Sequence, residues 1–307
     1  MQTVYHRTIR DPKLEIIDKP KRGSWVHVID PAVDELTRLE KNFNLDVDLL
    51  DDGIDLYEAP RLEWEEGILY IYVRYCRPKG EYTSTHPLLI VMAPDNVITI
   101  SRVASEPVEQ FIKYQKVITT QKMKLVLEIL EEINHGFRTH LNVVTRRILS
   151  MRNKLQKVAI SNPEVLNFID MEEDLNEFLA ALQPYELVLQ ALLSGRYIKM
   201  HESDEDLIED LRLSTNELIE LTKSRLATIQ NLREAYSTIT ANSLNRVFKL
   251  MTSITILMSI FTIITGFYSM NIKLPMSQDA NMFWIILTGS LSIIIVVAAL
   301  FKQKKWL

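Results

Sequence analysis

Two long runs without a charged residue lie near the C-terminal end of the sequence. The first extends from Leu250 to Tyr268 and the second from Met282 to Phe301, about 20 residues each. Because a helix rises about 1.5 Å per residue, each run can cross a hydrocarbon core of roughly 30 Å. The chain as a whole is only 47% hydrophobic, so this signal is local. We therefore predict two membrane-spanning helices, at about 248–268 and at 282–301.

A stripe of mostly small and polar residues follows the first run. A period of 3.5 residues is the seam of a bundle of like helices, and hydroxyls within hydrocarbon face protein or water. One interpretation is a tightly packed helix pair, and the other is a pore. One helix cannot enclose water, so a pore requires several copies of the chain around an axis. Steps of three and four residues along the stripe give Asn245, Phe248, Thr252, Thr255, Ser259, Thr262, Gly266 and Ser269.

Three segments at the end of the chain carry a family resemblance: Asn245-Arg-Val-Phe-Lys-Leu-Met-Thr, Thr262-Ile-Ile-Thr-Gly-Phe-Tyr-Ser-Met-Asn271 and Lys302-Gln-Lys-Lys-Trp-Leu307. Together they resemble the CorA family of divalent-cation (magnesium) transporters, in which the first crossing lines the pore and ends in Tyr-Gly-Met-Asn. Weaker similarity extends through the soluble part. Serine here replaces the glycine of that signature, and glycine permits backbone conformations that serine avoids. The signature residues in this chain are Tyr268, Ser269, Met270 and Asn271.

The resemblance implies a homo-oligomer, a pentameric funnel, that conducts hydrated divalent cations inward. The membrane potential would drive the flux, and Mg2+ is the expected ion, with no organic cofactor. Asn271 would accept hydrogen bonds from the hydrated ion at the outer mouth of the pore. From the residues alone, an Asn at the end of a helix is equally consistent with a C-cap.

Two further sets of candidates follow, the first from the residues of the stripe and the second from the resemblance. Asn245 suits either a second polar ring or a register-setting residue in a helix seam, and Phe248 with Met251 suits an apolar constriction. An acidic run from Glu202 to Asp210 is typical of a solvated helix face. The resemblance places a regulatory magnesium site near there. Its candidate ligands in this chain are Asp206, Glu209 and Asp210.

Other function classes receive less support. No phosphate-binding glycine loop, nucleophile elbow or Cys-x-x-Cys occurs, so nothing favours an enzyme. The net charge of −5 argues against nucleic-acid binding. Two alternatives remain: a relative that transports Co2+, Ni2+ or Zn2+ or that exports ions, and a membrane-anchored oligomeric sensor that does not conduct. Both alternatives arise because Ser269 replaces the glycine of the signature.

The remaining sequence predicts an α+β domain followed by a helical bundle. We expect an α/β domain at 1–105, with strands at 13–17, 25–29, 68–74, 88–92 and 97–101 and a helix opened by Asp30-Pro31. A helical region follows at 106–202, and one uninterrupted helix extends over 203–268. An outer loop (269–281) and a basic tail (302–307) flank the second crossing. We detect no secretory signal, and basic residues on one side of both crossings predict cytoplasmic termini in a plasma membrane.

Overall fold

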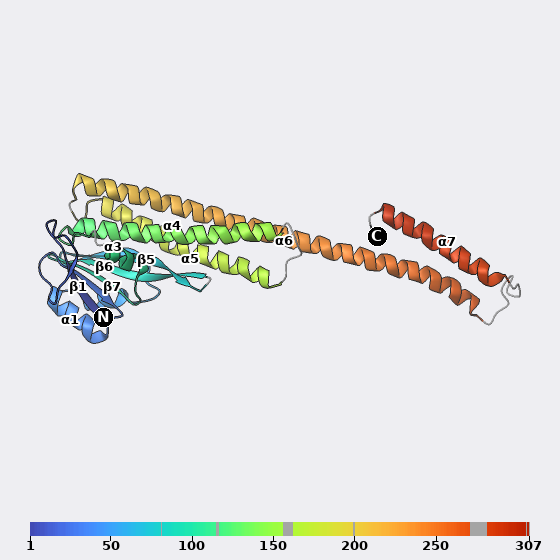
Figure 1. Ribbon diagram of the computed structural model, residues 1–307, viewed down its shortest axis with the longest axis horizontal. Coiled ribbons are helices and arrows are strands. Elements are labelled where there is room, and N and C mark those ends of the chain that lie inside the picture. The colour runs from blue at the N-terminus through green and yellow to red at the C-terminus, as the bar shows by residue number, and fades with distance from the viewer. Residues whose placement is uncertain are drawn as a thin grey trace. The chain divides into compact units, whose positions relative to one another are not determined.

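The structure is a computed structural model that describes residues 1–80, 82–114, 117–155, 162–198, 200–270, 281–304 and 306. At the margins of these ranges the side chains of 79, 82, 114, 154–155 and 162–166 are left out. The chain divides into two compact units, Met1–Leu232 and Arg233–Leu307. Helix α6 (Glu202–Tyr268) is continuous through the division (Figure 1).

The first unit contains a seven-stranded sheet with the order β2-β1-β3-β7-β6-β5-β4. Neighbouring strands are antiparallel except β3 and β7, which are parallel. Val26, Val28, Ile98 and Ile100, from the two parallel strands, are fully buried in the middle of the sheet. The strands are β1 (Gln2–His6), β2 (Glu15–Ile16), β3 (Trp25–Ile29), β4 (Arg61–Glu65), β5 (Ile68–Lys79), β6 (Tyr82–Met92) and β7 (Val97–Ser101).

Each predicted strand is present, although the bounds differ for three of them: the predicted strand at 13–17 is the shorter edge strand β2 at Glu15–Ile16. Strands β3 and β7 have the expected bounds, whereas β5 and β6 extend beyond the predicted 68–74 and 88–92. They are longer because the two strands pair over their whole length, from Leu69 with Met92 to Lys79 with Tyr82. The sequence interpretation missed β1 and β4. Strand β4 is a charged edge strand, the kind that natural sheets use to discourage further pairing.

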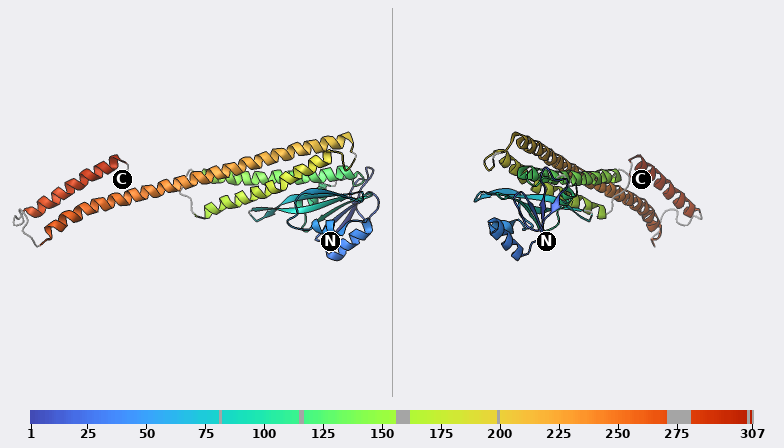
Figure 2. Two further views of the ribbon diagram at one scale, coloured as in Figure 1. Left: turned by 180° about the vertical axis from the view of Figure 1, so that it is seen from behind. Right: turned by 60° about the vertical axis from the view of Figure 1, so that its left-hand side comes forward.

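Helices cover both faces of the sheet (Figures 1 and 2). On one face, α1 (Val33–Phe43) and α2 (Val47–Asp52) bury Leu36, Leu39 and Leu50 against Val26 and Tyr70. Helix α1 begins later than predicted, because the backbone N–H of Asp30 still donates to Ser101 O at 2.8 Å, as at the end of a strand. The other face carries α3 (Glu106–Tyr114), α4 (Lys122–Leu155), α5 (Asn162–Leu193) and the beginning of α6.

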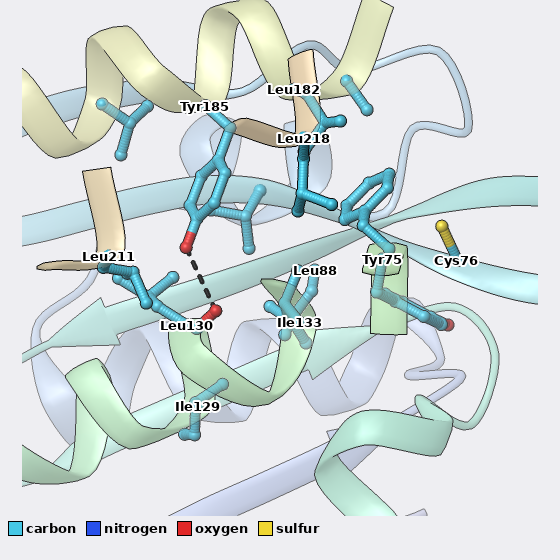
Figure 3. Close-up of a cluster of buried hydrophobic side chains, with 14 of the residues drawn as sticks. Tyr75, Cys76, Leu88, Ile129, Leu130, Ile133, Leu182, Tyr185, Leu211 and Leu218 are labelled. Atoms are coloured by element: carbon cyan, nitrogen blue, oxygen red, sulfur yellow. Dashed lines mark hydrogen bonds between the residues drawn. The ribbon is translucent and has the colours of Figure 1, made fainter. Parts of the chain in front are cut away.

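The helical layer is tied together by a large apolar core with a few buried polar contacts. Tyr185 of α5 is almost fully buried and donates its hydroxyl to Leu130 O of α4 at 3.1 Å (Figure 3). Phe137 and Phe178 pack edge to face with ring centroids 5.7 Å apart. Such burial, at about 25 cal/mol per Å² of apolar surface, is the main force that holds these helices on the sheet.

The second unit consists of α6 from residue 233 onward and α7 (Met282–Gln303). Both α6 and α7 contain a segment long and apolar enough to cross a membrane, and only 6% of each such segment is buried. The predicted long helix (203–268) is confirmed to within one residue at its start. The α+β region, the helical layer, the long helix and the second apolar helix of the predicted fold are therefore all confirmed.

Candidate functional site

The polar stripe of α6 is exposed along its whole length. Asn245, Thr252, Thr255, Ser259 and Thr262 are all exposed, as are the other three members of the stripe. The least exposed positions of the same segment lie on a different side of the helix. That buried side consists of Lys249, Ser253, Leu257, Ile260 and Ile264.

The buried side identifies where α7 packs. Its members are three and four residues apart, so they form one face of α6. On α7 the less exposed residues have the same spacing, with Ser290 only 2% exposed. Because α7 is the other helix of this unit, the two buried faces pack on each other. The polar stripe from Asn245 to Gly266 lies on the opposite side of α6, and α7 leaves this part of it uncovered.

The hydroxyl groups of the stripe are oriented by their own helix. Thr255 donates to Met251 O at 2.9 Å, Ser259 to Thr255 O at 2.8 Å and Thr262 to Met258 O at 2.9 Å. A hydroxyl has one proton and two acceptor lone pairs, so a proton committed to the backbone leaves acceptors on the outer surface. The water molecules around a metal cation present their protons outward. The stripe therefore has the acceptor chemistry that a hydrated cation needs.

Large apolar side chains interrupt the stripe at its end nearest the first unit in sequence. Phe248 and Met251 are 58% and 61% exposed. Asn245 is also exposed, one turn before Phe248. If copies of this helix surround an axis, Phe248 would form an apolar ring next to a ring of Asn245 amides. Apolar rings of this kind gate ion passage by excluding water.

The signature continues directly from the end of α6. The backbone N–H of Ser269 donates to Thr265 O at 3.1 Å, and its hydroxyl donates to Gly266 O at 2.8 Å. The non-glycine residues of the described chain with left-handed φ are Asp30, Asn44 and Glu66, so Ser269 is not among them. This backbone conformation therefore does not require glycine. Asn271 and the rest of the outer loop at 271–280 lie outside the described residues.

A small pocket of about 250 Å³ adjoins the signature on the side of α7. Tyr268 and Ser269 line it from α6, and Phe283 and Ile286 line it from α7. Thr265 is a further member that the sequence interpretation did not single out, because it falls between the steps of the stripe. Its hydroxyl donates to Phe261 O at 3.0 Å.

The three candidate regulatory acids do not form a metal site within one chain. Asp206, Glu209 and Asp210 are exposed on the first turns of α6. Throughout the part of the chain that the structure describes, no group of three or more His, Cys, Asp or Glu side chains can hold a metal ion. Asp210 instead lines a groove between α4 and α6.

Comparison with known proteins shows the same architecture in transporters. Residues 20–303 match the family described as CorA-like Mg2+ transporter protein. The cobalt/magnesium transport protein CorA of Methanocaldococcus jannaschii is 26% identical over 98% of this chain and 96% of its own length. That of Thermotoga maritima is 20% identical over 92% of this chain and 83% of its own length.

The similarity extends to a complete solved structure. The CorA magnesium transporter of Methanocaldococcus jannaschii superimposes with a TM-score of 0.90, at 21% identity, over 100% of this chain and 99% of that one. The family match covers far more than half of the chain, including both apolar helices and the stripe between residues 245 and 269. The protein therefore belongs to the family of CorA-like Mg2+ transporters.

Proposed function

We propose that this protein forms a homo-oligomeric channel through which hydrated divalent cations, with Mg2+ the principal one, enter the cell passively. The observation that carries the proposal is the uncovered polar stripe of α6, with α7 packed on the opposite side. If α7 covered the stripe, the stripe could not face the water of a pore. A pentamer, as the family resemblance implies, would bring five stripes around one axis.

The charges near the crossings support an orientation with both termini in the cytoplasm. Arg246 and Lys249 precede the first crossing, and Lys302 and Lys304 follow the second. In this orientation the two regions 1–105 and 106–202 are cytoplasmic and the loop 269–281 is outside. The membrane potential then favours entry by about 2.3 kcal/mol per charge per 100 mV, and by twice that for a divalent ion.

Within this pathway we assign the roles by position. A ring of Asn271 amides would receive the hydrated ion outside, the hydroxyls of Thr262, Ser259 and Thr255 would accept hydrogen bonds from its water, and Phe248 would form the inner constriction. Asp206, Glu209 and Asp210 would contribute to regulatory Mg2+ binding only together with residues of another copy. Because Ser269 replaces the signature glycine, two alternatives remain. One is transport of Co2+, Ni2+ or Zn2+, and the other is a sensor that does not conduct.

The test is cation flux into liposomes that contain the purified protein, with Mg2+, Co2+, Ni2+ and Zn2+ measured separately. We expect Mg2+ to enter at a rate that rises with an inside-negative potential, and Asn271→Ala to abolish entry. The matched control is Asn281→Ala, which removes the same amide at the other end of the loop. No flux of any of the four ions in the unmodified protein would contradict the proposal and favour the sensor.

A further inference from the structure

The pocket of about 250 Å³ beside the signature has walls that suit an apolar group. Phe261 lines it from α6, and Phe283 and Ile286 line it from α7. Two hydroxyls also reach it, and each donates its proton to its own helix: Thr265 to Phe261 O at 3.0 Å and Ser290 to Ile286 O at 2.7 Å. Because both protons are engaged in this way, shape and apolar contact decide what the pocket can hold.

Phe267 projects from the other flank of α6 at the same height. Successive residues of an α-helix are rotated by about 100°, so residues two positions apart lie roughly 200° apart, on nearly opposite sides. Phe267 is two residues from Thr265 and two residues from Ser269, and both of these line the pocket. Its side chain therefore leaves the helix away from the pocket of its own chain, and it is 57% exposed. One chain thus carries an apolar pocket and an exposed aromatic side chain on opposite flanks of one helix turn.

A cyclic assembly and a two-fold pair bring these two features together differently. In a cyclic assembly, one flank of each helix contacts the other flank of the next copy, because the interface is heterologous. In a two-fold pair of parallel helices the same flank meets itself, so Phe267 would face Phe267. Rotation about an axis along the helices keeps equivalent residues at one height. Phe267 of one copy therefore meets the pocket of another in the cyclic assembly and not in the pair.

Close packing is what such a contact contributes within a membrane. Lipid tails are as apolar as the side chains that they touch, so membrane helices associate largely through van der Waals contact. A pocket left open lacks contact atoms on one side, and an aromatic side chain supplies them.

We propose that Phe267 of each copy occupies the pocket of the next copy, where it contacts Tyr268 and Ser269 and so holds neighbouring signatures together at the outer end of the first crossing. The proposal rests on the proposed function, because it requires copies of α6 arranged around a pore axis. It adds the side chain and the pocket through which those copies meet.

The test is oxidative cross-linking of the full-length protein in liposomes, with two cysteines introduced in each chain, Thr265→Cys and Phe267→Cys. Within one chain these two side chains leave α6 on nearly opposite sides, so a disulfide can form only between copies. We expect a ladder of cross-linked species on a non-reducing gel, up to the full oligomer. A second pair, Ser269→Cys with Phe267→Cys, should give the same ladder. The unmodified protein should give none, because Cys76 is only 1% exposed.

The matched control is Ile263→Cys with Phe267→Cys. Residues four positions apart lie on one side of a helix, so both thiols are then on the flank away from the pocket. In a cyclic assembly this variant should give no cross-linked species. A ladder from the control equal to that from the pocket pairs would show random collision between chains and would overturn the proposal.

Two single variants separate this proposal from the channel itself. A cross-linked dimer from Phe267→Cys alone would show a two-fold pair and would overturn both. Ser259→Cys lies on the stripe and should cross-link across the pore axis. Cross-linking through Ser259→Cys, with none in either pocket pair, would overturn the Phe267 contact and leave the proposed channel standing.

Discussion

Ser253 and Ser259 lie six residues apart on α6 and occupy opposite environments. Each donates its hydroxyl to a carbonyl four residues earlier at 2.8 Å, Ser253 to Lys249 O and Ser259 to Thr255 O. Ser253 is nevertheless fully buried, whereas Ser259 is exposed. The local bond is the same, so the difference arises from α7, which packs on one side of α6 only.

Loss of a hydroxyl from the stripe should slow ion passage. Thr255→Val keeps the shape of the side chain and removes an acceptor that would face the ion. One hydrogen bond contributes about 1 kcal/mol, so we expect roughly fivefold slower Mg2+ uptake into liposomes. Thr288→Val on α7 is the matched control, because Thr288 makes the same kind of bond, to Trp284 O at 2.6 Å. Equal slowing in both variants would contradict a pore along the stripe.

Glycine at position 269 should not be required for transport. The backbone of Ser269 continues from the helix without left-handed φ, so Ser269→Gly should leave the Mg2+ flux nearly unchanged. Its thermal midpoint should also change little, because Ser269 lies one residue beyond the end of α6, where glycine does not carry the cost that it has inside a helix. Ser292→Gly is the contrasting variant: Ser292 lies inside α7, where glycine costs about 0.5–1 kcal/mol, so its thermal midpoint should fall. Flux only in the glycine variant would show that the natural protein does not conduct.

The buried carboxylate of Asp174 should make the first unit less stable as pH rises. The Oδ1 atom of Asp174 accepts a hydrogen bond from Thr83 N at 3.1 Å, and its Oδ2 atom lies 3.6 Å from Arg147 Nη1. The Asp174 side chain is only 5% exposed. Burial raises the pKa of Asp174 above 3.8. The hydrogen bond from Thr83 and the charge of Arg147 partly offset this increase, whereas the charges of Glu177 and Asp170 add to it. A raised folded-state pKa means that the protonated form favours folding. Its contribution is fully present below pH 3.8 and is lost as pH rises through the folded-state pKa.

The measurement is the thermal midpoint as a function of pH for the unmodified protein and for Asp174→Asn. We expect the midpoint of Asp174→Asn, relative to the unmodified protein, to increase as pH rises above 3.8. Glu173→Gln removes an exposed carboxylate from the same helix and should show no such trend. A constant difference between Asp174→Asn and the unmodified protein across the pH series would contradict the assignment.

The single cysteine should be chemically inert in the folded protein. Cys76 is 1% exposed in β5, and burial, with smaller contributions from Glu177 and Asp174, raises the pKa of its thiol. The thiolate is the reactive form, so iodoacetamide should label the native protein far more slowly than the protein unfolded in denaturant. Leu149→Cys, at a position that is 50% exposed, supplies a reactive positive control. Equal labelling of Cys76 in both states would show that β5 opens readily.

Local signals explain which parts of the fold could be predicted from sequence. Helix α6 was predicted to within one residue because helical hydrogen bonds are local and no proline interrupts residues 202–268. The two crossings follow from the absence of charge over a sufficient length. Strand β7 is buried along its whole length and β3 everywhere except Ile29, and both are rich in β-branched residues, so they too were predictable.

Tertiary contacts decided the features that the sequence interpretation missed. Strand β1 forms through pairing with β3, and β5 and β6 gain length from each other, because sheet hydrogen bonds join residues far apart in the chain. The three-four spacing predicted the stripe of α6, yet only the packing of α7 on Ser253 shows that the stripe is left uncovered. Sequence by itself therefore determined the helices, the crossings and the family. The tertiary structure decided which helix faces are available for an ion or a ligand, because burial depends on packing partners that the local sequence does not encode.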